Sequence, residues 1–113
     1  MSKALMKRIH DKEIEDSEYV PELIGMRPLE NGRLALAFWN EKTRKEEVRI
    51  YDVWKAHPKD GKGVKYLDWY DPVKFKQCYL YMDMIWWEQD IELSIDHIYY
   101  YTKLVKEDFQ KLI

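Results

Sequence analysis

The stretch that decides the fold runs from Leu23 to Trp39 and reads LIGMRPLENGRLALAFW. Its two apolar runs are separated by Glu30–Arg33, which contains Asn31-Gly32. Asn-Gly is a strong signal for a β-hairpin, because a type I′ turn needs a positive φ at both central residues and these residue types tolerate it best. Beyond the turn, apolar side chains recur at every second position, at Leu34, Leu36 and Phe38. We therefore expect antiparallel strands at about residues 23–29 and 33–40.

The segments after this hairpin predict a second hairpin and short helices. Residues 40–47 are too charged to be core, and alternation resumes at Val48 and Ile50, so that a loop in solvent should separate two strands. Residues 52–57 can form one helical turn. Asp71 followed by Pro72 predicts a helix start, because aspartate caps free N–H groups and proline has no N–H to leave unpaired.

The last third of the chain predicts more strands and a closing helix. Tyr79–Trp87 is typical of a hairpin that turns near Asp83, and the apolar residues Ile91 and Leu93 continue the sheet. Ser94 is placed to cap a helix whose apolar residues recur at helical spacing, with a break near Thr102. The predicted fold class is α+β: a mainly antiparallel sheet built from hairpins, with short helices and a C-terminal helix.

Length and composition limit the domain number and the classes of function. A chain of 113 residues is long enough for one packed core. We expect an N-terminal arm or weak helix at residues 1–21 and a single α+β domain at residues 22–113. The 19 Lys and Arg residues against 21 Asp and Glu give a net charge of −2, so no excess positive field is available to hold nucleic acid. Autonomous DNA binding is not expected.

The cellular compartment is predicted from what the sequence lacks. The chain has a single cysteine, its first residues lack a signal-peptide pattern, and no apolar run approaches the ~20 residues of a spanning helix. These observations favour a cytoplasmic protein without a membrane span.

The side chains that could carry chemistry do not form a recognisable set. His10, His57 and His97 lie far apart, and none stands in a zinc-binding pattern. Gly61–Gly63 lacks the spacing of a phosphate-binding loop. Cys78 and His97 are formally available as nucleophile and base, but a small buried thiol is the commoner outcome at such a position. We therefore expect no catalytic, cofactor-binding or metal-binding residues, and no enzyme.

Carboxylates and tryptophans are the candidates for contact with a partner. Glu88, Asp90 and Glu92 would share one face of an uninterrupted strand beside Trp86, whereas a turn at residues 88–90 would scatter them. Such a row fits a basic protein surface better than a metal ion. Alternation also places at least one tryptophan outside the main core, where this residue is a favoured anchor. The candidate partner-binding residues are Trp39, Trp54, Trp86, Glu88, Asp90 and Glu92.

The order of these motifs resembles the domain of unknown function 2442 family. The resemblance covers about residues 22–99 and rests on Met26–Phe38, Arg49–Asp52 (RIYD), Asp71–Phe75 (DPVKF) and Trp87–Tyr99 (WEQDIELSIDHIY). The chain departs from the family pattern in three places. Its loop at 40–47 is longer and lacks the usual glycine, Asp90 stands where a turn glycine is common, and Glu92 replaces an aspartate.

The resemblance implies a small α+β domain with no established enzymatic activity. Members resemble components of two-gene toxin–antitoxin systems, so it implies that this chain is the antitoxin half. Such a protein would neutralise a toxin-like protein from a neighbouring gene by direct binding. The alternative is a small-molecule ligand-binding or sensor domain with an aromatic-lined sheet. An aromatic edge strand also favours a homodimer, because one patch then serves both copies.

Overall fold

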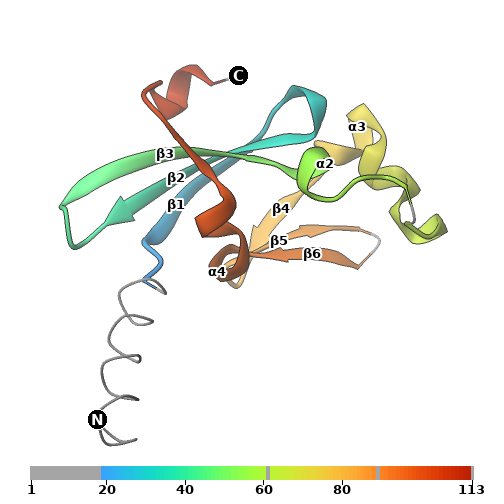
Figure 1. The fold of residues 1–113 in the computed structure, drawn as a ribbon, viewed down its shortest axis with the longest axis horizontal. Coiled ribbons are helices and arrows are strands. Elements are labelled where there is room, and N and C mark those ends of the chain that lie inside the picture. Colours follow the sequence, from blue (N-terminus) through green and yellow to red (C-terminus); the bar gives the residue numbers. More distant parts are fainter. Residues whose placement is uncertain (1–18, 61, 89, 113) are drawn as a thin grey trace, which may run out of the picture.

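Two antiparallel sheets form the framework of the molecule (Figure 1). This computed structural model describes residues 19–60, 62–88 and 90–112, so the predicted arm at residues 1–21 lies outside the described residues except for residues 19–21. The large sheet has the order β1-β2-β3-β7 and the small sheet the order β4-β5-β6. Their strands are β1 (Glu22–Pro28), β2 (Arg33–Asn40), β3 (Lys45–Asp52), β4 (Tyr79–Tyr81), β5 (Met84–Trp87), β6 (Ile91–Ser94) and β7 (Lys103–Val105). The predicted α+β class is confirmed.

The hairpin predicted at Asn31-Gly32 joins β1 to β2. The two strands pair antiparallel, with one register shift near Gly25. Asn31 and Gly32 have φ values of 61° and 68°, as the sequence predicted. Glu30 joins them in a short 3₁₀ turn, η1 (Glu30–Gly32). A hydrogen bond of 2.8 Å from the Leu29 N–H to the Arg33 carbonyl closes the turn.

The second predicted hairpin is also present, with a shorter loop than expected. β3 begins at Lys45 and pairs with β2 along its whole length, so only residues 41–44 form the turn. The Asn40 side chain stabilises this turn by accepting hydrogen bonds from the N–H groups of Lys42 and Thr43, at 3.0 and 3.1 Å. The expectation that all of residues 40–47 project into solvent is therefore wrong.

Short helical segments connect the sheets. α2 (Val53–Ala56), η2 (Val64–Tyr70) and α3 (Pro72–Phe75) follow β3, and each α segment begins where the sequence predicted. Asp71 caps α3 by accepting two backbone N–H bonds, at 2.9 and 3.0 Å, and Asp52 caps α2 by accepting one, from Lys55. Within the described residues, no helix has the length and apolar character needed to cross a membrane.

The C-terminal segment combines helical turns with a strand. Ser94 precedes α4 (Ile95–Ile98) and η3 (Tyr99–Tyr101), although its side chain makes no capping hydrogen bond. The helical turns stop at Thr102, as predicted, but residues 103–105 then form β7 on the edge of β3, and η4 (Phe109–Lys111) closes the described chain. A strand replaces the predicted continuation of the helix because residues 103–105 pair with β3, and Phe109 beyond them packs in a second core with Ala35 and Ala37.

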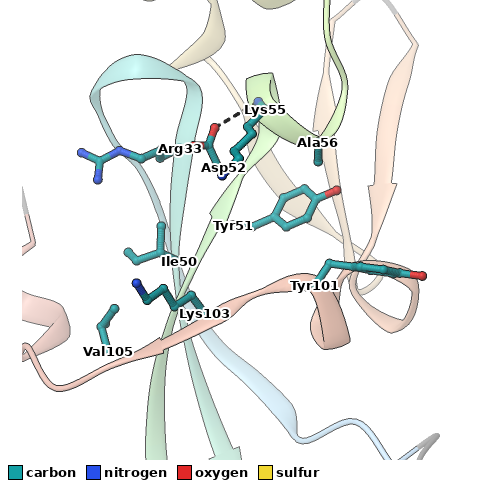
Figure 2. A pocket seen from close by; sticks show the side chains of 9 residues that line it. All are labelled: Arg33, Ile50, Tyr51, Asp52, Lys55, Ala56, Tyr101, Lys103 and Val105. Carbon is teal, nitrogen blue, oxygen red and sulfur yellow. Dashed lines mark hydrogen bonds between the residues drawn. The ribbon is translucent and has the colours of Figure 1, made fainter.

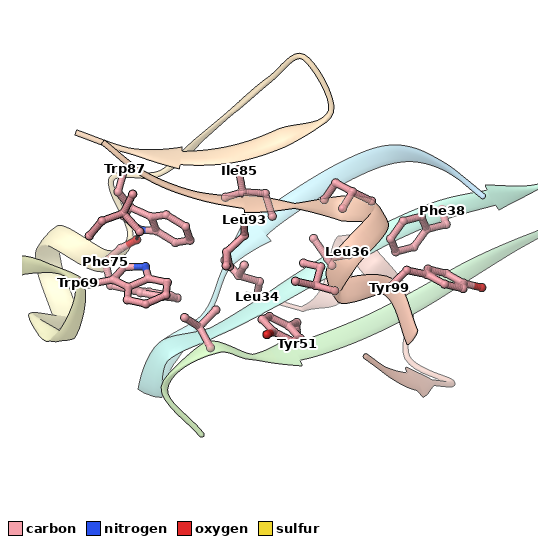
Figure 3. Packing of buried hydrophobic residues seen from close by; sticks show 14 residues of the cluster. Leu34, Leu36, Phe38, Tyr51, Trp69, Phe75, Ile85, Trp87, Leu93 and Tyr99 are labelled. Carbon is pink, nitrogen blue, oxygen red and sulfur yellow. Dashed lines mark hydrogen bonds between the residues drawn. The ribbon is translucent and has the colours of Figure 1, made fainter. Parts of the chain in front are cut away.

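The main core lies between the two sheets (Figure 3). Leu34, Leu36 and Phe38 belong to this core, whereas Ala35 and Ala37 face a second, smaller core with Phe109, so the predicted alternation along β2 is confirmed. Aromatic rings close one end of the main core. Trp87 stacks edge-on against Trp69, with ring centroids 5.4 Å apart, and its Nε1–H donates to the Phe75 carbonyl at 2.7 Å.

Glu47 connects the C-terminal segment to the large sheet. Its carboxylate accepts hydrogen bonds from the Tyr99 hydroxyl at 2.6 Å, the Asn40 amide at 2.8 Å and the Arg49 guanidinium at 2.6 Å. Burial alone would raise the pKa of Glu47, but these hydrogen bonds and the charge of Arg49 outweigh burial, so the pKa is lowered. This cluster supplies hydrogen-bond partners for Glu47, which allows the charged residues 45–47 to form the first part of β3. The alternation of apolar residues in the sequence could not show this.

Replacing Glu47 with glutamine should cost stability in a pH-dependent way. A carboxylate whose pKa is lower in the folded state than in the unfolded state stabilises the fold at pH values above its unfolded-state pKa. That stabilisation is lost as the pH falls through the folded-state pKa. We expect Glu47→Gln to lower the free energy of unfolding by roughly 2 kcal/mol at pH 7, the scale of a hydrogen bond to a charged group. In urea titrations this gap should shrink as pH falls below 4.5, the ordinary glutamate pKa. Glu46→Gln, an exposed neighbour, is the control, and an equal gap at every pH would contradict the assignment.

Gly32 cannot carry a side chain in this fold. A Cβ atom there would lie 2.1 Å from the Trp54 indole, and the φ of +68° disfavours any other residue. We expect Gly32→Ala to lower the free energy of unfolding by roughly 3 kcal/mol, from the left-handed backbone and the overpacking together. Gly63→Ala is a matched control, because a Cβ atom there meets nothing within 4 Å. Similar urea midpoints for the two variants would show that the Trp54 contact does not restrict this turn.

Candidate functional site

The carboxylates predicted to form a row do not lie on one face. Glu88 and Asp90 belong to the turn between β5 and β6, and only Glu92 lies within a strand. Asp90 has a φ of 59°, a left-handed conformation that ends the extended chain at this point. The uninterrupted strand is therefore wrong, and the alternative, a turn that scatters the carboxylates, is correct. Glu92 does lie beside Trp86, its partner across the β5–β6 ladder.

Trp39 and Trp54 lie on other parts of the molecule. Trp39 is half-buried on β2, and its Nε1–H donates to the Glu41 carboxylate at 2.8 Å. Trp54 packs over Gly32, and its Nε1–H donates to the Trp69 carbonyl at 2.8 Å. The structure therefore does not gather the predicted tryptophans into one surface. Their contact with a partner stays a prediction.

The outer face of the small sheet carries a group of aromatic and sulfur side chains. Ile85 and Trp87 point into the core, so alternation places their neighbours on the opposite face. Across the β4–β5 ladder, Tyr79 lies opposite Trp86, and Tyr81 lies opposite Met84. We call Tyr79, Tyr81, Met84 and Trp86 the aromatic face.

The aromatic face is open to solvent and held in place. Tyr79 is 50% exposed and Tyr81 59% exposed, and Met82 in the adjoining turn is 77% exposed. The Trp86 Nε1–H donates to the Tyr81 carbonyl at 3.2 Å, which fixes the indole across the hairpin. Sequence reasoning identified Trp86 but missed Tyr79 and Tyr81. The signal was available in the strict alternation of Tyr79–Trp87 about its turn.

The segment that carries the aromatic face is acidic. The segment from residue 77 to residue 102 contains no Lys or Arg. Its carboxylates are exposed, in the turns at Asp83, Glu88 and Asp90, on β6 at Glu92 and in α4 at Asp96. A large aromatic surface bordered by one sign of charge fits a partner of the opposite sign.

A groove on the large sheet is the second candidate site (Figure 2). It lies beside β3, between α2 and β7, and has a volume of about 660 Å³. Ile50, Tyr51 and Val105 contribute apolar surface, and Tyr101, which is 78% exposed, lies at one side. This volume is within the range of small-molecule sites, which is roughly 300–1,000 Å³.

Cations border this groove. Arg33, Lys55 and Lys103 line it, and within the described residues none of them forms an ion pair with a carboxylate. Asp52 also lines the groove, but its carboxylate already accepts the Lys55 N–H as the cap of α2, at 3.1 Å. The groove therefore combines an apolar floor with a local excess of positive charge. Sequence reasoning missed it, because β7 was predicted as helix.

Among the described residues, no hydrogen bond joins Cys78 to His57 or His97. Burial raises the pKa of the Cys78 thiol to about 11, and its Sγ lies 3.8 Å from the Met26 Sδ. His97 is exposed on α4. His57 is half-buried, its Nε2 lies 2.8 Å from the Tyr51 hydroxyl, and burial followed by the charge of Lys62 lowers its pKa. In the part of the chain that the structure describes, no group of three or more metal-ligating side chains comes together.

Comparison with family models, with curated proteins and with solved structures found no match for this chain. The resemblance to the domain of unknown function 2442 family therefore stays a prediction. The aromatic face and the groove are the two candidate sites within the described residues.

Proposed function

We propose that this chain is a non-enzymatic protein-interaction module that binds a basic partner through the aromatic face. The observation that carries the proposal is the pairing of exposed Tyr79 with Trp86 and of exposed Tyr81 with Met84, within a segment, residues 77–102, that has carboxylates but no Lys or Arg. In this proposal it is the antitoxin half of a two-gene toxin–antitoxin system, and it neutralises a toxin-like protein from the neighbouring gene by covering it. The family resemblance adds the biological setting.

The composition of the aromatic face supports binding to protein. Trp, Tyr and Met are enriched in protein–protein interfaces, and Trp and Tyr among the residues that dominate binding energy. A monomeric protein rarely leaves such side chains gathered in the open without use. Trp86 and Tyr81 therefore serve as anchors in this proposal.

The charge pattern supports a basic partner. Arg side chains stack on Trp and Tyr rings while they pair with carboxylates, so Trp86 beside Glu92 offers both contacts to one guanidinium. Exposed carboxylates at Glu88 and Asp90 add attraction at longer range, which speeds encounter with a positively charged surface. Salt screens such attraction, so complex formation should weaken as ionic strength rises.

Truncation of the anchors should abolish the interaction. We expect Trp86→Ala and Tyr81→Ala each to weaken binding of the neighbouring gene's product by at least about 30-fold, which corresponds to roughly 2 kcal/mol. The variants should also lose relief of that product's toxicity on co-expression. Binding is measured by calorimetry with the purified proteins.

Val73→Ala is the control for surface truncation, because Val73 is 68% exposed on α3, outside the aromatic face. It should bind like the unchanged chain. The proposal fails if the two proteins form no complex, or if the Trp86 and Tyr81 variants bind as tightly as the control.

The groove supports a second candidate function, the binding of a small molecule. Its apolar floor and its three cations, Arg33, Lys55 and Lys103, suit an anion with an apolar body, such as an aromatic carboxylate or sulfonate. A sensor domain would use such a site to respond to a metabolite. Small-molecule binding in the groove and partner binding through the aromatic face involve different residues, so either function can be present without the other.

Titration with 2-naphthalenesulfonate tests the groove. We expect amide chemical shifts of the ¹⁵N-labelled chain to change near Ile50, Lys55 and Lys103, and the double variant Arg33→Gln/Lys103→Gln to weaken affinity at least about tenfold, or roughly 1.4 kcal/mol. Lys45→Gln removes one exposed cation at the other end of β3 and should leave affinity unchanged. Shifts centred on Trp86 instead would show that the probe binds the aromatic face, and the ligand-binding candidate would be dropped.

A further inference from the structure

β4 leaves one edge of the small sheet open. It pairs with β5 on one side, and the strand order places no strand on the other. Its three residues are all exposed, Tyr79 at 50%, Leu80 at 42% and Tyr81 at 59%. Natural proteins usually protect an edge strand with charge, proline or a bulge, because an open edge pairs readily with another strand. β4 has none of these three protections, and only its length of three residues limits pairing at this edge.

The backbone of Leu80 faces this open edge. Met82 and Asp83 have φ values of 52° and 60°, which makes them the central residues of a two-residue turn closed by the Tyr81–Met84 pair. The residues that flank such a turn form a hydrogen-bonded pair, and pairs alternate along an antiparallel ladder. Leu80 opposite Ile85 is therefore a non-hydrogen-bonded pair. Its N–H and C=O point away from β5, and no residue of the described chain bonds them on that side.

The sequence of β4 suits antiparallel pairing with a second copy of the same strand. Tyr79-Leu80-Tyr81 reads the same in both directions, so antiparallel pairing with a second copy across a two-fold axis places Leu80 opposite Leu80 and Tyr79 opposite Tyr81. The two Leu80 residues would then exchange both backbone hydrogen bonds. The tyrosines would form cross-strand aromatic pairs, and no like charges would meet within the strand.

We propose that β4 pairs with β4 of a second copy of this chain, so that the two small sheets join into one continuous antiparallel sheet. An axis perpendicular to the sheet keeps both aromatic faces on the same side. The homodimer therefore presents a doubled aromatic surface. Only the use of that surface to bind a partner rests on the proposed function. The pairing itself requires no partner protein.

Salt separates this pairing from partner binding. Each small sheet lies in a segment that has carboxylates but no Lys or Arg, so two copies repel each other at the shared edge. Added salt screens that repulsion and should strengthen the homodimer, whereas it should weaken binding to a basic partner. A monomeric chain that still binds its partner would therefore overturn this inference and leave the proposed function intact.

Disulfide trapping at Leu80 tests the pairing. The Cα atoms of a hydrogen-bonded antiparallel pair are about 5.5 Å apart, within the range that a disulfide spans. In a Cys78→Ser background, which removes the only native thiol, we expect Leu80→Cys to form a covalent dimer under mild oxidation. Leu67→Cys in the same background is the control, because Leu67 is 53% exposed on η2 and is not part of β4. It should stay monomeric on a non-reducing gel.

Sedimentation of the unchanged chain provides a measurement that needs no cysteine. The weight-average mass should rise toward twice 13.9 kDa with concentration, and more readily in 0.5 M than in 0.05 M salt. Leu80→Pro, which removes the N–H at the edge, should return the mass to that of a monomer. A monomer mass at every concentration, or equal cross-linking of the Leu80 and Leu67 variants, overturns the pairing.

Discussion

The structure depends on the burial of β2 on both faces. Every side chain from Leu34 to Phe38 is almost fully buried, the larger ones against the small sheet and the alanines against Phe109. Burying one large apolar side chain stabilises a fold by about 1.5–3 kcal/mol, whereas an isolated hairpin is marginal in water. Gly25 permits the second layer, because a Cβ atom there would lie 3.0 Å from the Phe109 ring. The first hairpin therefore persists only when both layers cover it.

Local signals predicted the turns and the helix starts, and contacts between distant residues decided the rest. Asn31-Gly32 and Asp71-Pro72 act through their own backbone, so the sequence alone could identify them. The extension of β3 depends on Tyr99, which reaches Glu47 from more than fifty residues away, and β7 depends on pairing with β3, which lies equally far away in the sequence. Neither contact produces a hydrophobic periodicity in the segment whose structure it determines.

In the candidate sites too, local sequence patterns predicted some features, whereas contacts between distant residues determined the others. Alternation placed at least one tryptophan outside the core, and the same reasoning could have placed Tyr79 and Tyr81 there. The carboxylate row was wrong because Asp90 occupies a left-handed conformation, which asparagine and glycine signal more clearly than aspartate does. The groove is formed only when Lys103 on β7 and Lys55 on α2 line the same hollow, which only the folded chain defines.

The edge-on contact of Trp69 with Trp87 has an optical consequence. Two indoles whose centroids are 5.4 Å apart, with planes inclined at 75°, couple their electronic transitions and share the excitation. Such a pair gives a split circular-dichroism band in the far ultraviolet that vanishes when the rings separate. The closed end of the main core thus contains its own spectroscopic reporter, and its signal distinguishes loss of side-chain packing from loss of strands.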